Sequence, residues 1–214
     1  MYLLTETASP FALERWAAFF ANFGQFAKGF FYTLGISIGA LIVALLLGLI
    51  FGAMSSTHNK VLRGISRVYV EIFQNTPLLV QFVVVFYGIS ILTDGHVMIP
   101  ISLTAILCVG VYTGAYISEI IRTGIEAVPK GQTEAALSQG FTYADTMRII
   151  ILPQAVRTIL PPLTNQVVNL IKNTSTVAII SGADIMFTAK AWAYDTTNYV
   201  PAFAGAAFLY FIMC

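Results

Sequence analysis

Charged residues are scarce in this chain of 214 residues. Lys, Arg, Asp and Glu make up 10% of it, whereas an average soluble domain contains about 25%. Hydrophobic residues make up 57%, and the mean hydropathy is +0.81. This balance excludes an ordinary cytosolic protein and predicts a polytopic membrane protein surrounded by lipid. The formal net charge of +1 gives no reason to expect a nucleic acid as a partner.

Residues that carry catalytic or metal chemistry are also rare. The two cysteines, Cys108 in an apolar run and Cys214 at the last position, do not form a readable disulfide framework. His58 and His96 are isolated in expected loops, which indicates neither a metal site nor a Ser-His-Asp arrangement. The sequence lacks the phosphate-binding pattern Gly-x-x-x-x-Gly-Lys-Ser/Thr. We therefore expect no catalytic residue, no metal and no cofactor in this chain.

The first 29 residues form an N-terminal segment that precedes a transmembrane domain over residues 30–214. The segment carries Glu6 and Glu14 and lacks a basic head before an apolar core, unlike a cleaved signal peptide. Aromatic residues recur from Phe11 to Phe26, which predicts an interfacial amphipathic helix. An extension of the first membrane span explains the same pattern almost as well.

Five apolar segments predict an all-α fold with five transmembrane helices, since a span needs about 20 apolar residues. The segments cover about 30–54, 68–92, 100–122, 160–180 and 201–214. The first contains glycines spaced four apart, which allow close helix packing in lipid. Gln74–Pro77 interrupts the second, and Pro161-Pro162 is expected to disrupt the backbone where the fourth begins. The last segment spans only about 21 Å as a helix, so we expect a helix that is cut short, with a re-entrant end as the alternative.

Basic residues orient these spans. Residues 55–67 contain Lys60, Arg63 and Arg67, and residues 122–150 contain three further basic residues, whereas residues 93–99 contain no Lys or Arg. Basic loops of a membrane protein stay in the cytoplasm. The N terminus is therefore expected outside and the C terminus inside.

The second basic loop, about 123–152, contains a predicted pair of short helices. Pro129 suits a first helical turn, and Gly140 stands where a helix end favours a left-handed residue. Thr142 is a predicted cap for the second helix, and Pro153 is expected to interrupt the backbone. Such a hinged loop suits either docking of another protein or contact with the bilayer surface.

The same loop carries a recognisable spacing. Its EAALSQG, followed by FTYADTMRIIILP, resembles the cytoplasmic loop signature of ABC importer permeases. The stretches VEIFQNTPLLVQ, GAYISEIIRTGIEAVPKGQTEAA and LPPLTNQVVNLIKNTSTVAIIS look like the polar amino acid branch of that family. One departure is Gln74, which stands where the family's second-span motif usually has an arginine.

The resemblance implies a type I importer permease in the bacterial plasma (inner) membrane, with a coupling helix that docks on an ATPase. It also implies a dimer of ATP-binding cassette ATPases, which would bind ATP and Mg, a second permease chain, identical or related, and an extracytoplasmic amino acid binding protein. By motif match, the ATPase-coupling role falls on Glu134, Ala135, Ala136, Gly140, Leu152 and Pro153.

Polar residues inside the expected spans are costly in lipid and predict a substrate path. They are Gln74, Thr76 and Gln81 in the second span, and Asn165, Gln166, Asn169, Lys172, Asn173 and Thr176 in the fourth. Four of the latter recur at helical spacing, which favours a lumen over a polar seam between helices. Lys172 is expected to meet a substrate α-carboxylate, to pair with Glu71 or Glu119, or to snorkel to an interface.

The residues near these amides predict the class of substrate. Tyr112, Tyr116 and Glu119 share one face of the third span, where packing explains the tyrosines equally well. Gln166 and Asn173 are amides without a nearby Asp or Glu, which favours glutamine, glutamate or aspartate over a cationic amino acid. The alternatives are an ABC permease for arginine, histidine or lysine, an ion-coupled secondary transporter, and a non-transporting membrane scaffold.

Overall fold

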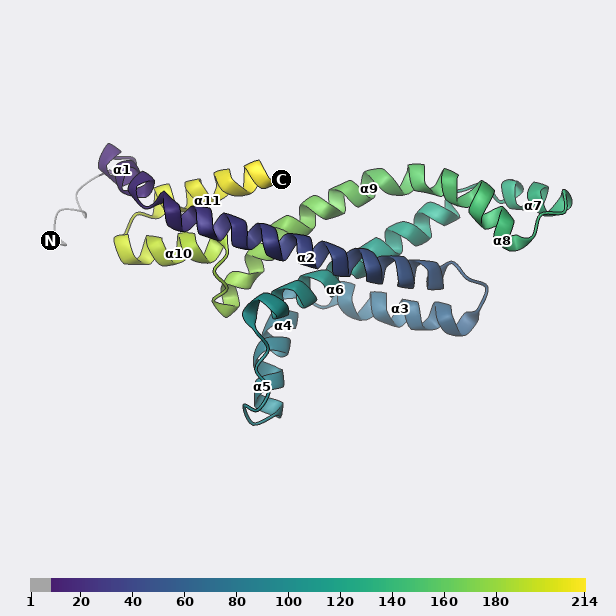
Figure 1. The fold of residues 1–214 in the computed structure, drawn as a ribbon, viewed down its shortest axis with the longest axis horizontal. Helices are drawn as coiled ribbons and strands as arrows, with labels where there is room; N and C mark the ends of the chain where they lie inside the picture. Colours follow the sequence, from purple (N-terminus) through teal and green to yellow (C-terminus); the bar gives the residue numbers. More distant parts are fainter. Residues whose placement is uncertain (1–8) are drawn as a thin grey trace. The chain divides into compact units, whose positions relative to one another are not determined.

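The computed structural model describes residues 9–214, and the part of the N-terminal segment in residues 1–8, with Glu6, lies outside them. Residues 9–214 are mostly helical and contain no β-strand (Figure 1). The helices are α1 Leu13–Ala21, α2 Phe23–Ser55, α3 Lys60–Asn75, α4 Leu78–Val83, α5 Ile89–Leu92, α6 Ile101–Glu126, α7 Lys130–Ser138, α8 Tyr143–Asp145, α9 Leu152–Asn173, α10 Ile185–Thr196 and α11 Tyr199–Met213. Val84–Gly88 and Thr146–Ile151 are π-helical, and Thr174–Ile180 is a 3₁₀ helix.

Two helices, α2 and α6, are each long and apolar enough to cross a membrane. Helix α3 and the segment Leu78–Leu92 form a third span if the two together cross the membrane once, as a helix that is broken in the middle. That break is at Thr76, where the backbone is extended, as the Gln74–Pro77 interruption predicts. Length and composition thus support two or three of the five expected spans.

The chain forms two compact units, and α2, α6 and α9 each contribute to both. The first unit contains the described part of Met1–Gly39, together with Leu79–Ile106 and Ile171–Cys214. The second contains Ala40–Leu78 and Leu107–Leu170.

In the second unit, α2 and α6 run parallel and pack through small residues on both helices. Four glycines each face an aliphatic side chain of the other helix: Gly48 faces Ile117, Gly52 faces Ile121, Gly110 faces Val43 and Gly114 faces Leu47. A Cβ atom at Gly48, Gly52 or Gly110 would overlap its partner, whereas a Cβ atom at Gly114 would lie 2.8 Å from the Tyr69 hydroxyl of α3 and 3.1 Å from Leu47. The predicted close approach is therefore confirmed for Gly48 and Gly52, whereas the space around Gly35 is open.

Helix α3 is fastened to the same pair of helices. The Tyr69 hydroxyl donates a hydrogen bond of 2.7 Å to the Val111 carbonyl, and its ring stacks on Phe51 at a centroid distance of 4.0 Å. Ser66 donates to the Phe51 carbonyl at 2.7 Å. The Asn59 side chain caps the start of the helix by accepting from the first amides. The stretch expected as a loop over 55–67 is therefore largely helical.

In the first unit, Phe19 of α1 anchors a small aromatic core. Its ring packs against Phe26 and Trp192 and fills the space that the missing side chain of Gly205 leaves. The chain breaks at Asn22, so α1 is a separate short helix, whereas Phe26 belongs to α2. Residues from Phe23 onward thus extend the helix of the first expected span, and the interfacial role of α1 stays a prediction.

Residues 181–200, expected as a loop, contain α10. Asp184 caps this helix because its carboxylate accepts from the amides of Met186 and Phe187, at 3.1 and 3.0 Å. The Tyr210 hydroxyl donates to the same carboxylate at 3.2 Å, and Asp184 is fully buried. Burial raises the pKa of the Asp184 carboxyl to about 6, and the hydrogen bonds offset this only in part.

Helix α9 corrects the expected disruption at Pro161-Pro162, because it continues through both prolines from Leu152 to Asn173. Proline removes the hydrogen bond to the carbonyl four residues earlier. Those carbonyls belong to Arg157 and Thr158, which are both exposed. The two carbonyls that lose a hydrogen bond are therefore not buried in the protein core. Pro153 does not interrupt the backbone either, since it is the second residue of α9.

Candidate functional site

The turn after α7 has the geometry that the sequence predicts. Gly140 adopts a φ of +87°, in the left-handed region that favours glycine. Its amide donates to the Leu137 carbonyl at 3.0 Å, and the amide of Phe141 donates to the Ala136 carbonyl at 3.2 Å. These two bonds form a Schellman motif, which ends the helix and turns the chain sharply.

Thr142 then caps the next helical segment, also as predicted. Its hydroxyl oxygen accepts from the Asp145 amide at 3.2 Å, and the hydroxyl donates to the Asp145 carboxylate at 2.6 Å. The expected second helix is not a separate element, however. Its three α-helical residues continue through the π-helical Thr146–Ile151 into α9. The loop therefore has one turn, at Gly140, and one continuous helix after it.

The two alanines of the loop differ in exposure. Glu134 and Ala135 are exposed, whereas Ala136 is only 3% exposed because α7 packs on the π-helical turn. Ala136 therefore supports the loop from inside, and its coupling role stays a prediction. The apolar side chains that the loop does expose are Leu137, Phe141, Tyr143, Ile149 and Leu152. Pro153 is exposed as well.

A polar cavity of about 300 Å³ lies within the second unit. Its lining comes from α3, α6 and α9 and consists of Gln74, Tyr116, Glu119, Ile120, Thr123, Pro162, Asn165 and Gln166. Three predicted path residues, Gln74, Asn165 and Gln166, are thus brought together. We call this cavity the amide pocket.

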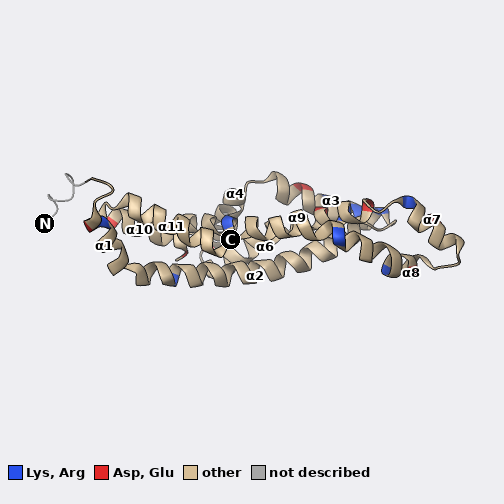
Figure 2. Cartoon of the chain, turned by 90° about the horizontal axis from the view of Figure 1, so that it is seen from above, with Lys and Arg blue, Asp and Glu red and all other residues tan. Residues whose placement is uncertain are grey.

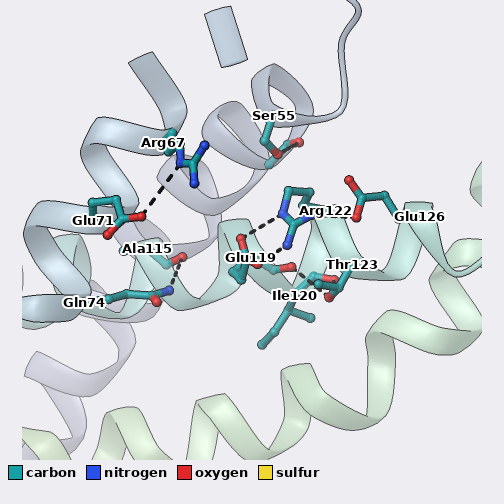
Figure 3. Close-up of polar contacts among 11 residues, drawn as sticks. Ser55, Arg67, Glu71, Gln74, Ala115, Glu119, Ile120, Arg122, Thr123 and Glu126 are labelled. Atoms are coloured by element: carbon teal, nitrogen blue, oxygen red, sulfur yellow. Dashed lines mark hydrogen bonds and ion pairs between the residues drawn. The ribbon is translucent and has the colours of Figure 1, made fainter. Parts of the chain in front are cut away.

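Local contacts fix the walls of the amide pocket. The Gln74 side-chain amide donates to the Ala115 carbonyl at 3.2 Å (Figure 3). The hydroxyls of Tyr112 and Tyr116 lie 3.1 Å apart. The expectation that Gln166 has no acidic neighbour is wrong, because Glu119 of α6 lines the same cavity. The prediction considered only the residues near Gln166 in the sequence, and Glu119 comes from a different helix. That carboxylate is held by the Arg122 guanidinium, with Nε to Oε2 at 3.0 Å.

The other predicted path residues are not in the amide pocket. Lys172 lines a cavity of about 300 Å³ within the first unit, with Tyr210, Ser175 and apolar residues of α10 and α11. Glu71 and Glu119 contact Arg67 and Arg122 respectively, and the role of Lys172 stays a prediction.

The predicted polar stripe is also interrupted. Helix α9 ends at Asn173, and Thr176 lies beyond it in the 3₁₀ helix, where the helical spacing no longer applies. Asn169 is exposed and Asn173 half-buried. Thr76 lies at the break after α3, and Gln81 is buried in α4.

A larger cavity in the second unit was not predicted. It measures about 720 Å³ and is lined by Ser55, Lys60, Arg63, Gly64, Ser66, Arg67, Val70, Glu71, Gln74, Asn75, Glu119, Arg122 and Glu126. We call it the charged groove. Arg122 contacts both Glu119 and Glu126, and Arg67 lies 3.8 Å from Glu71 (Figure 3). The spacing of Lys60, Arg63 and Arg67 on one face of a helix was the signal available in the sequence.

Residues 44–214 match the family described as the binding-protein-dependent transport system inner membrane component. The chain belongs to this family. The permease is 38% identical over 197 residues to the probable glutamine ABC transporter permease protein GlnM of Bacillus subtilis (strain 168), covering 91% of the permease and 88% of the relative. It is 35% identical over 187 residues to the glutamate/aspartate import permease protein GltJ of Escherichia coli (strain K12), covering 79% and 76%.

Solved structures support the same fold. The permease matches the crystal structure of an amino acid ABC transporter with histidines, with a TM-score of 0.85 and 32% identity over 92% of the permease and 91% of that chain. An inward-facing MetNI methionine ABC transporter matches at a TM-score of 0.71 and 17% identity, over 90% and 92%, which shows the fold alone. The type I permease fold is therefore confirmed. The permease is a membrane transport subunit, and in its family ATP hydrolysis belongs to a separate subunit.

Proposed function

We propose that the permease imports a polar amino acid of the glutamine, glutamate or aspartate class, driven by partner ATPases. The observation that carries this proposal is the amide pocket, where side chains from three helices face one cavity of amino acid size. The names of the relatives GlnM and GltJ, which specify glutamine and glutamate/aspartate, support the same class.

The chemistry of the amide pocket favours this class over cationic amino acids. Amide groups both donate and accept hydrogen bonds, so Gln74, Asn165 and Gln166 suit a carboxylate or a carboxamide side chain. The one carboxylate in the lining, Glu119, is held by Arg122. A cationic side chain would have to break that ion pair to find a negative partner.

The remaining polar residues extend the proposed path. We assign Thr76 and Gln81 to the broken second span, and Asn169, Asn173 and Thr176 to positions beyond the amide pocket. Lys172, beside Tyr210 in its own cavity, offers an ammonium group to a substrate carboxylate during transport. Substitution of these residues would change transport without changing the amide pocket.

Coupling to ATP hydrolysis is proposed for residues 123–152. The exposed Glu134 and Ala135 and the apolar side chains around Gly140 form the surface for an ATP-binding cassette ATPase, one of a pair that binds ATP and Mg. Leu152 and Pro153 pass the movement into α9, whose continuity supports a rigid connection. A second permease chain, identical or related, and an extracytoplasmic binding protein complete the proposed transporter.

The proposed topology has five spans over residues 30–214, with the N terminus outside and the C terminus in the cytoplasm. Three basic residues lie on α3, one lies at the end of α6 and two lie in the stretch from α7 to η2, whereas α11 carries no charged residue (Figure 2). Basic segments remain in the cytoplasm, which orients these elements inward.

Purification followed by transport measurement tests the proposal. The permease should co-purify with an ATPase, and proteoliposomes containing both subunits and the binding protein should take up L-[³H]glutamine or L-[³H]glutamate when ATP is enclosed. Tight inhibition by arginine but not by glutamine would reject the proposed substrate class. Uptake driven by an ion gradient without ATP would support a secondary transporter instead.

A further inference from the structure

The charged groove has an unusual balance of ions. Four cationic side chains face three carboxylates in its lining, which gives a formal charge of +1. Arg122 is occupied by Glu119 and Glu126, and Arg67 by Glu71. Lys60 and Arg63 have no carboxylate partner among residues 9–214.

Helix α3 has a charged face and an apolar face. Lys60, Arg63 and Arg67 line the groove, whereas Val61, Ile65 and Val68 are exposed elsewhere on the helix. An apolar outer face suits lipid tails or another protein, and the cations on the other face are available to a small anion inside the groove. This arrangement favours a dissolved ligand over a lipid headgroup.

The groove also adjoins the amide pocket. Gln74 and Glu119 line both cavities. An amino acid that leaves the amide pocket past these two residues would meet the ion cluster of Arg122 directly (Figure 3). Its carboxylate can compete with Glu119 and Glu126 for the guanidinium, and its ammonium group can compete with Arg122 for Glu119.

We propose that the charged groove is a second binding site for the amino acid, selective for acidic side chains, in which Lys60 and Arg63 bind the carboxylates. The inference rests on the proposed function, since it takes the ligand to be the transported amino acid. The net positive charge favours glutamate and aspartate over glutamine and disfavours arginine. On the proposed orientation the groove opens to the cytoplasm, so accumulated glutamate would occupy it and slow further import.

Binding of L-[³H]glutamate to the complete transporter tests the proposal, in phosphatidylcholine nanodiscs without binding protein or nucleotide. We expect saturable binding, with glutamate preferred to glutamine. The double variant Lys60→Gln/Arg63→Gln should bind about tenfold more weakly. The double variant Lys28→Gln/Arg157→Gln is the control, because it removes the same charges from exposed positions outside the groove. A second readout is uptake at rising internal glutamate, which should inhibit wild type more strongly than the groove variant.

The outcomes separate this inference from the proposed function. If wild type imports glutamate but the groove variant binds and is inhibited like wild type, the second site is rejected and the importer assignment stands. If wild type imports no amino acid, the proposed function fails first. A second set of nanodiscs that contain phosphatidylglycerol tests the lipid alternative. If the groove variant retains less phosphatidylglycerol than wild type but binds glutamate equally well, the groove binds a lipid headgroup and the proposal is wrong.

Discussion

Gly48 of α2 and Ile117 of α6 lie in direct contact, so that a Cβ atom on Gly48 would stand 2.7 Å from the Cβ atom of Ile117. The contact belongs to a set in which each helix supplies glycines to the other. Without a strong hydrophobic driving force between helices in lipid, such close packing is a main source of helix association. The parallel pair of α2 and α6 in turn supports α3 and the two polar cavities.

Gly48→Ala should therefore destabilise the permease by about 1–3 kcal/mol, because the added methyl group overpacks the contact with Ile117. Thermal unfolding of the purified transporter in detergent measures this. Gly35→Ala is the control, since the space around Gly35 is open. Equal effects at Gly35 and Gly48 would contradict the packing account.

Gly140→Ala should weaken coupling, because a φ of +87° strains any residue with a Cβ by about 1–2 kcal/mol. Gly140→Pro should abolish transport, since proline cannot adopt this φ and lacks the amide that bonds to Leu137. Both effects are measured as ATP hydrolysed for each amino acid imported. Gly131→Ala, in the adjoining α7, removes a glycine without positive φ and should leave this ratio unchanged. A normal ratio in Gly140→Pro would reject the hinge.

Asn165→Ala should raise the apparent KM for glutamine about tenfold, the effect of losing roughly one well-placed hydrogen bond. Initial uptake rates in proteoliposomes at saturating binding protein give this value. Thr158→Ala changes an exposed side chain on the same helix outside the amide pocket and serves as the control. Unchanged kinetics in Asn165→Ala would remove this residue from the path.

Asp184 predicts a pH dependence of stability. Its pKa in the folded state, about 6, lies above the ordinary value of 3.8, so folding favours the protonated form. The stabilisation is fully present below pH 3.8 and is lost as the pH rises through 6, on the order of 3 kcal/mol in total. Asp184→Asn should flatten the change in Tm between pH 5 and pH 7.5, because an amide does not titrate. An equally steep profile in the variant would show that another group is responsible.

Local patterns predicted the features that depend on neighbouring residues. Gly140 and Thr142 follow from turn and cap chemistry, which acts over three or four residues, and both are confirmed. The continuous helix through Pro161-Pro162 was missed because proline's cost depends on whether the carbonyls left without a partner are buried. Helix α10 was missed because it is short and moderately polar, and its start depends on Asp184 in contact with Tyr210 from another helix.

The candidate site divides in the same way. Spacing along α9 identified Asn165 and Gln166, but it placed Thr176 on the same helical face, although α9 ends at Asn173. The charged groove could be predicted only in part, since two of its three carboxylates, Glu119 and Glu126, come from α6, whereas its free cations come from α3. The ion pair between Arg122 and Glu119 joins neighbouring residues of one helix. Its position between the two cavities depends on α3, because Gln74 and Glu119 together line both of them.

Uptake of L-[³H]glutamine by sealed proteoliposomes tests the central claim most directly, with the permease, its ATPase and the binding protein present. We predict accumulation when ATP is enclosed, none with a non-hydrolysable analogue, and loss of accumulation in Gly140→Pro while the subunits remain assembled. Accumulation that persists without ATP, or that Gly140→Pro leaves intact, would contradict an ATP-driven importer coupled through this loop.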